Sequence, residues 1–140
     1  MRKILVIGVV TTGALVLSAL VATSAEAGSC GGTVFATPFK RSKPVSASCG
    51  HIGTTNDATV TYNWDVAGGS SGKACVEGLG HDRLAGPDTY GHAPIVEKWY
   101  SLGCGTSGGA ELPWGYVAAV PQVRAQSENV PLGTYVDWRN

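Results

Sequence analysis

The stretch Ala58–Asp65, which reads ATVTYNWD, decides the fold class. Val60, Tyr62 and Trp64 alternate with smaller polar residues, so the bulky side chains would share one face of a β-strand. No segment after residue 27 has the helical periodicity of an amphipathic helix. The sequence therefore predicts an all-β protein.

Outward from this stretch, short runs of β-branched and aromatic residues are separated by Gly, Pro, Ser, Asn and Asp. This texture is typical of a small antiparallel β-sandwich and predicts about seven strands in two packed sheets. The expected strands are Thr33–Thr37, Val45–Cys49, Ala58–Asp65, Lys73–Glu77, Ile95–Leu102, Tyr116–Ser127 and Thr134–Trp138.

The connections are predicted from their turn residues. We expect a turn over Ala67–Gly72, after which Lys73–Glu77 pairs as a hairpin with Ala58–Asp65. Gly78–Pro94 is expected to be irregular, and Gly105–Gly109 to be a flexible link. Pro121 cannot donate a ladder hydrogen bond, so its strand is expected at an edge or bulged.

The first 27 residues have the pattern of a secretory signal peptide. Arg2 and Lys3 precede an apolar run, Ile4–Ala22, and Ala25-Glu26-Ala27 is a suitable cleavage site. The run is long enough for a membrane anchor, but it lacks a basic stop-transfer flank. We expect cleavage after Ala27, which leaves residues 28–140 as one secreted domain.

The charge balance of residues 28–140 excludes several partners. Eight Lys and Arg face nine Asp and Glu, so the basic excess typical of nucleic-acid binding is absent. No phosphate loop, dinucleotide fingerprint, Gly-x-Ser-x-Gly or His-Glu-x-x-His is present. We therefore expect no nucleic acid, no membrane insertion after signal cleavage, and no cofactor.

All four cysteines, Cys30, Cys49, Cys75 and Cys104, follow the signal. An even number of cysteines in an exported chain indicates disulfides, although three pairings are possible. We favour Cys30–Cys49 and Cys75–Cys104, because each pair closes a loop with turn residues between two expected strands. Their spacing has no Cys-x-x-Cys unit, so no zinc site is expected.

The first candidate binding site is the segment from Thr37 to Pro44, which carries Phe39, Lys40, Arg41 and Lys43. Two prolines and a disulfide would restrict this loop before it binds, which lowers the entropic cost of association. It suits a loop that inserts Lys40 or Arg41 into an acidic protease pocket. The alternative is a solvated connection whose basic residues confer solubility.

The second candidate is Gly78–Pro94, where His81, Asp82 and His92 could supply acid–base catalysis. The same residue types could ligate a metal, but their spacing matches no catalytic or metal signature. The alternative is that Asp and Gly in this segment simply form turns and have no catalytic or metal-binding role.

The third candidate is aromatic. Trp64 and Trp99 lie in expected strands and are predicted to fill the core. Trp114 lies between Pro113 and Gly115, where periodicity does not bury it, and Tyr116 follows closely. Exposed Trp and Tyr rings can stack on sugars or anchor a protein partner, so these two residues are a candidate binding surface.

The order of the four cysteines, with a strand between the two expected loops, loosely resembles that of small two-disulfide amylase inhibitors. That resemblance implies a β-sandwich with sequential disulfides. The Trp-Arg-Tyr triplet of those inhibitors is absent between Cys30 and Cys49, so no functional residue is transferred.

The sequence thus favours a small secreted non-catalytic protein that binds an extracellular protein or polysaccharide. Its sharpest form is an inhibitor of an extracellular hydrolase. The alternatives are a cell-envelope or polysaccharide-binding module, and a small secreted hydrolase that uses the second candidate site.

Overall fold

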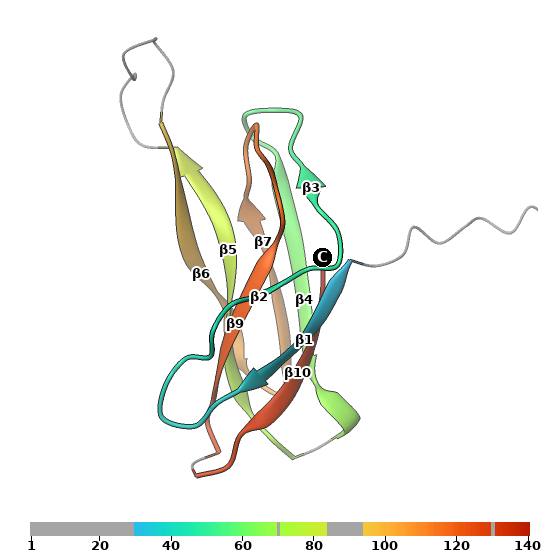
Figure 1. Cartoon of the computed structure of the whole chain (residues 1–140), viewed down its shortest axis with the longest axis vertical. Helices are drawn as coiled ribbons and strands as arrows, with labels where there is room; N and C mark the ends of the chain where they lie inside the picture. The colour runs from blue at the N-terminus through green and yellow to red at the C-terminus, as the bar shows by residue number, and fades with distance from the viewer. Residues whose placement is uncertain (1–29, 70, 84–93, 130) are drawn as a thin grey trace, which may run out of the picture.

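The computed structural model describes residues 30–69, 71–83, 94–129 and 131–140 (Figure 1). Within these ranges the chain is all-β, as predicted, with ten strands and one short 3-10 turn, η1 (Ala67–Gly69). The expected number of strands was too low, because His51–Ile52 and Ser107–Pro113 were not predicted as strands and the segment Tyr116–Ser127 holds two strands instead of one. The predicted signal peptide lies outside the described residues.

One four-stranded sheet has the order β1-β10-β4-β7, with every neighbouring pair antiparallel. Its strands are β1 (Gly31–Ala36), β10 (Thr134–Arg139), β4 (Thr59–Val66) and β7 (Ser107–Pro113). Because β1 pairs with β10, the first and last strands lie side by side, and Asn140 donates its backbone N–H to the Cys30 carbonyl over 2.7 Å.

A second four-stranded antiparallel sheet has the order β2-β9-β5-β6. Its strands are β2 (Val45–Ser46), β9 (Gln122–Ser127), β5 (Ala74–Arg83) and β6 (Ile95–Gly105). A small third sheet pairs β3 (His51–Ile52) with β8 (Ala118–Ala119). Pro121 stands between β8 and β9, so it ends one strand and precedes the next. The segment is therefore split in two, and β9 lies inside its sheet rather than at an edge.

Both four-stranded sheets contribute side chains to one hydrophobic core. The predicted alternation of β4 is confirmed, since Val60, Tyr62 and Trp64 are buried between exposed neighbours. The polar atoms of the two rings are satisfied in the core. The Tyr62 hydroxyl donates to the Leu79 carbonyl at 2.9 Å, and Trp64 Nε1 donates to the Leu102 carbonyl at 3.0 Å.

The glycines after Glu77 continue a strand instead of starting the expected irregular stretch. A Cβ atom on Gly78 would lie 3.1 Å from a Leu112 methyl carbon, and one on Gly80 would lie 2.9 Å from the Tyr100 ring. Here glycine permits close packing of neighbours onto β5. The prediction of an irregular segment is therefore wrong for residues 78–83.

Two connections also differ from expectation. The segment after η1 does not pair with β4, because β4 and β5 belong to different sheets. The expected flexible link at Gly105–Gly109 is largely part of β7. A Cβ atom on Gly108 would lie 2.8 Å from Trp64 Nε1, so this glycine lets β7 approach a large core ring.

The two disulfides join Cys30 to Cys49 and Cys75 to Cys104, the pairing favoured from the sequence. The second pair bridges directly opposite residues of β5 and β6. Disulfides of this kind indicate an oxidising environment. In the described part of the chain, no helix is long and apolar enough to cross a bilayer.

Candidate functional site

The loop from Thr37 to Pro44 joins β1 to β2 and forms a tight turn at Phe39. The Lys40 backbone N–H donates to the Pro38 carbonyl at 2.9 Å, and the Thr37 hydroxyl donates to the Lys40 carbonyl at 2.5 Å. Phe39 has a φ of 68°, which is uncommon for a residue with a side chain. A positive φ with an i→i+2 hydrogen bond is the rarer, strained form of the γ-turn.

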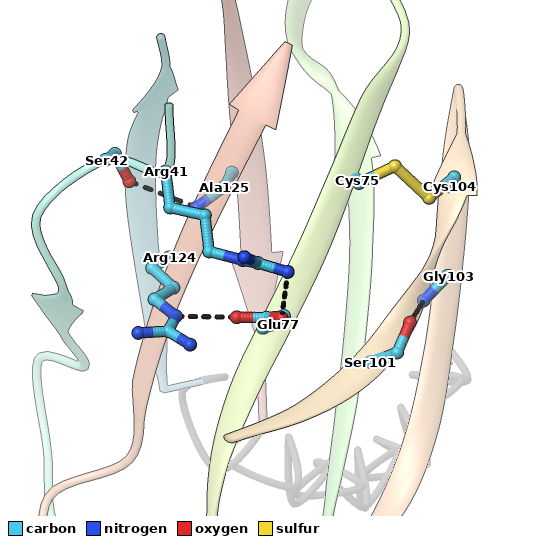
Figure 2. A network of polar contacts seen from close by, with 9 residues as sticks. All are labelled: Arg41, Ser42, Cys75, Glu77, Ser101, Gly103, Cys104, Arg124 and Ala125. Atoms are coloured by element: carbon cyan, nitrogen blue, oxygen red, sulfur yellow. Dashed lines mark hydrogen bonds and ion pairs between the residues drawn. A yellow bond between two sulfur atoms is a disulfide. The ribbon is translucent and has the colours of Figure 1, made fainter. Parts of the chain in front are cut away.

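The same loop is fastened to strand β9. The Ser42 backbone N–H donates to the Ala125 carbonyl at 2.8 Å, and the Ala125 N–H donates to the Ser42 hydroxyl at 3.0 Å (Figure 2). At the other end of the turn, the Ser127 N–H donates to the Thr37 carbonyl at 2.9 Å. Backbone hydrogen bonds therefore hold the loop on both sides of Phe39.

An ion-pair cluster fixes one of the loop's basic side chains. Figure 2 shows Arg41 and Arg124 directed at the Glu77 carboxylate, with Arg41 Nη2 2.5 Å from Oε1 and Arg124 Nε 2.6 Å from Oε2. The Arg41 side chain is therefore held in place although it remains 54% exposed, and Phe39, Lys40 and Lys43 are exposed beside it.

Arg124 also explains the position of Trp99, which the sequence analysis placed in the core. The Trp99 ring is only partly buried, and the Arg124 guanidinium lies 4.4 Å from its centroid. A cation stacked on an indole covers the ring without burying it in the core. The core prediction for Trp99 is therefore wrong.

His81 and Asp82 lie on β5, but they do not form a pair. Successive side chains of a strand point to opposite faces, so Asp82 points away from His81. Asp82 instead forms an ion pair with Lys98 at 3.2 Å. The third residue of this candidate, His92, lies outside the described residues.

Asp82 also lies close to Tyr100, and the two groups affect each other's pKa. The Tyr100 and Lys98 side chains lower the pKa of Asp82. Burial, and then Asp82, raise the pKa of Tyr100 to about 12. Among the described residues, the Tyr100 hydroxyl has no partner that meets full hydrogen-bond geometry.

His81 is buried, with 6% of its surface exposed, and its ring meets Trp114 edge-on at 4.5 Å. Burial lowers the pKa of His81, and nearby Glu97 partly opposes this effect. The Nδ1 atom has no hydrogen-bond partner among the described residues. Glu97 stands opposite His81 in the β5–β6 register, but a buried imidazole whose Nδ1 is unpartnered among the described residues is a poor match for an acid–base pair. A hollow of about 170 Å³ lies beside it, lined in part by Asn56, Asp57 and Arg83.

Trp114 is fully buried, which contradicts its role as an exposed aromatic platform. Its Nε1 donates to the Val117 carbonyl at 2.9 Å. The ring of His51 also meets the Trp114 ring edge-on, at 5.3 Å. The next residue, Gly115, has a φ of 67°, and its N–H and that of Trp114 both donate to the Ala58 carbonyl at 2.8 Å. Tyr116, by contrast, is 68% exposed.

A pair of exposed aromatic residues, Phe35 on β1 and Tyr135 on β10, was not predicted from the sequence. The two rings lie 4.9 Å apart, next to an open pocket of about 520 Å³. Both positions could have been found from alternation, because Val34 and Ala36 flank Phe35 and Val136 follows Tyr135, all directed to the core.

Among the described residues, one group of potential metal ligands comes close together: Cys75, Cys104 and Glu128. The two cysteines are joined in a disulfide, so this group offers no thiolate to a metal.

No protein-family model, curated protein or solved structure matches the chain.

Proposed function

We propose that this protein is a small extracellular non-catalytic binding protein that recognises a protein partner through the Thr37–Pro44 loop. The observation that carries the proposal is Phe39. Its side chain is 71% exposed at the tip of a turn that is held by hydrogen bonds on both sides. An exposed aromatic ring on a restrained backbone is the form that an interface anchor takes.

Preorganisation supports this role because ordering a flexible loop on binding lowers affinity. The Cys30–Cys49 disulfide, the Ser42–Ala125 hydrogen bonds and the Arg41–Glu77 ion pair all restrict the loop before any partner arrives. Phe39 can then enter an apolar pocket of the partner without a further loss of backbone freedom.

The charge around Phe39 indicates the chemistry of the partner. Lys40 and Lys43 are exposed on either side of the engaged Arg41. A partner that offers an apolar pocket with an acidic rim would complement this arrangement. An extracellular hydrolase with an acidic specificity pocket remains the sharpest form of the proposal, with Lys40 as the entering side chain.

The alternatives receive less support from the same geometry. The hydrolase alternative needs His81 to exchange protons with a substrate, but His81 is buried, and Asp82, the carboxylate expected to assist it, is paired with Lys98. The polysaccharide alternative no longer has Trp114 available, because that ring is buried.

The proposal also includes the scaffold and its location. We infer that the two four-stranded sheets form a β-sandwich, because both contribute to one core. We also infer that residues 1–27 direct export, since two disulfides are expected of a secreted domain.

The test uses the full chain, expressed with its own leader in an exporting host and purified from the medium. Trypsin-like and subtilisin-like proteases and amylases are assayed with micromolar protein, and direct binding to each enzyme is measured in parallel. We expect binding to at least one enzyme, with loss of affinity in Phe39→Ala and Lys40→Ala.

Tyr116→Ala is the matched control, because it removes another exposed aromatic side chain from outside the loop. Unchanged rates with every enzyme would remove the inhibitor form of the proposal. Binding that survives both loop substitutions would exclude the loop as the recognition surface.

A further inference from the structure

A second site lies beside η1, where β10 begins (Figure 1, lower end). It is an open pocket of about 520 Å³, a volume within the range of small-molecule sites. It involves no residue of the Thr37–Pro44 loop, so it is independent of the function proposed above.

The pocket is uncharged. None of the described residues that line it is acidic or basic. Its polar groups include the hydroxyls of Thr33 and Ser71 and the side-chain amide of Asn129, and Leu132 contributes an apolar surface. The Thr33 hydroxyl donates to Asp137 at 2.5 Å, so its oxygen is oriented to accept a hydrogen bond from a ligand.

An aromatic ring borders these groups. Tyr135 is 59% exposed and lines the pocket. Its ring is supported by Phe35, whose ring lies 4.9 Å away at a tilt of 55°. Phe35 in turn lies against Gly133, where an added Cβ would come within 2.3 Å of the Phe35 ring. The tyrosine therefore stands on a packed support.

We propose that this pocket binds a neutral carbohydrate, with the Tyr135 ring stacked on a pyranose face. A pyranose has a C–H face that packs on an aromatic ring and an edge of hydroxyls that exchange hydrogen bonds. The pocket offers both kinds of surface, through Tyr135 and Leu132 on one hand and Thr33, Ser71 and Asn129 on the other. An anionic ligand would find no positive charge in the lining and would meet the Asp137 carboxylate next to Thr33.

The experiment uses the protein expressed from its full-length gene, labelled with ¹⁵N and purified from the medium. It is titrated with cellohexaose, N-acetylchitohexaose and maltohexaose. We expect saturable shifts of the backbone amides of Thr33, Ser71, Asn129 and Tyr135 with at least one of these sugars. Tyr135→Ala should weaken that affinity about fivefold to tenfold, whereas Tyr135→Phe, which keeps the ring, should retain most of it.

Tyr116→Ala is again the matched control, since it removes another exposed tyrosine, from the connection between β7 and β8, and should leave the affinity unchanged. The proposal is overturned if none of the three sugars gives saturable shifts up to about 10 mM. It is also overturned if the shifts map away from the pocket, if Tyr116→Ala weakens binding as much as Tyr135→Ala, or if hexagalacturonate binds more tightly than the neutral sugars.

Because the two sites share no residue, their tests fail separately. Phe39→Ala should leave sugar shifts at Tyr135 unchanged, and Tyr135→Ala should leave enzyme binding through the loop unchanged.

Discussion

Two prolines in this chain are followed by an aromatic residue, and the two aromatic side chains end in opposite environments. Pro38-Phe39 places a ring at the tip of a loop with 71% of its surface exposed, whereas Pro113-Trp114 places a ring in the core with none exposed. The local sequences are alike, since each aromatic residue lies at a turn with a positive φ at or after it. The difference lies in the long-range contacts, because the rings of His51 and His81 pack against Trp114 and no described ring packs against Phe39.

The largest effect expected from this contrast is that of Trp114→Ala. Removing a buried indole leaves a cavity and should lower the free energy of unfolding by about 3–5 kcal/mol. Chemical denaturation monitored by far-UV circular dichroism measures this loss. Tyr116→Ala, two residues along the chain and exposed, should change stability by no more than about 0.5 kcal/mol. Equal losses in the two variants would contradict the burial of Trp114.

The second prediction concerns the buried histidine that covers Trp114. Burial lowers the pKa of His81 in the folded protein, so below its ordinary pKa of about 6.5 the unfolded chain takes up a proton first. Stability should therefore fall as the pH drops from neutral through this value toward the lower folded pKa. His81→Gln should reduce the fall between pH 7 and pH 5, measured as the difference in denaturation midpoint.

Neighbouring titratable groups affect stability in a different direction or in a different pH range from His81. Glu97 opposes the shift, so a larger pH dependence is expected in Glu97→Gln. The lowered pKa values of Asp57 and Asp82 affect stability only at more acidic pH, as these carboxylates become protonated. A pH dependence that is identical in the wild-type protein and His81→Gln would show that His81 titrates normally in the folded state.

The contrast between Phe39 and Trp114 also shows which features of the fold could be predicted from the sequence. The alternation of Val60, Tyr62 and Trp64 is local, so β4 and its buried face were predicted correctly. Gly78, Gly80 and Gly108 were assigned to turns or links because glycine is common there. They serve instead to admit neighbouring side chains, and only the tertiary neighbours of each glycine reveal that role.

The candidate sites also combine features that local sequence predicts with features that depend on tertiary contacts. The boundaries of the Thr37–Pro44 loop follow from its prolines and cysteines, which are visible in the sequence. That Arg41 faces Glu77 depends on how β5 and β9 pair, and the burial of Trp114 depends on β3 and its histidine. Phe35 and Tyr135 were within reach, because both lie at outward positions beside residues that alternate into the core.

The third prediction tests what holds the exposed ring in place. Glu77→Ala removes the carboxylate shared by Arg41 and Arg124 and leaves two cations close together. Because the arginines are partly exposed, the loss of global stability should be no more than about 1 kcal/mol. The loop should respond more clearly, with faster hydrogen exchange at the Ser42 amide.

Asp65→Ala provides the control for Glu77→Ala. It removes a weaker, exposed ion pair with Arg139 on the other four-stranded sheet, at 3.7 Å. It should leave exchange at Ser42 unchanged. If both variants accelerate that exchange equally, the ion-pair cluster does not restrain the loop.

The smallest effect on stability is expected for Phe39→Gly, and it separates the two aromatic residues most sharply. Glycine adopts a positive φ without the cost that a Cβ imposes, but it gives the unfolded chain more freedom. These two effects oppose each other, so the free energy of unfolding should change by less than about 1 kcal/mol. The turn should persist, with the Lys40 amide still protected from exchange, while binding to a partner is lost with the ring. A destabilisation close to that of Trp114→Ala would mean that Phe39 is packed like a core residue, and the proposed recognition surface would then have no anchor.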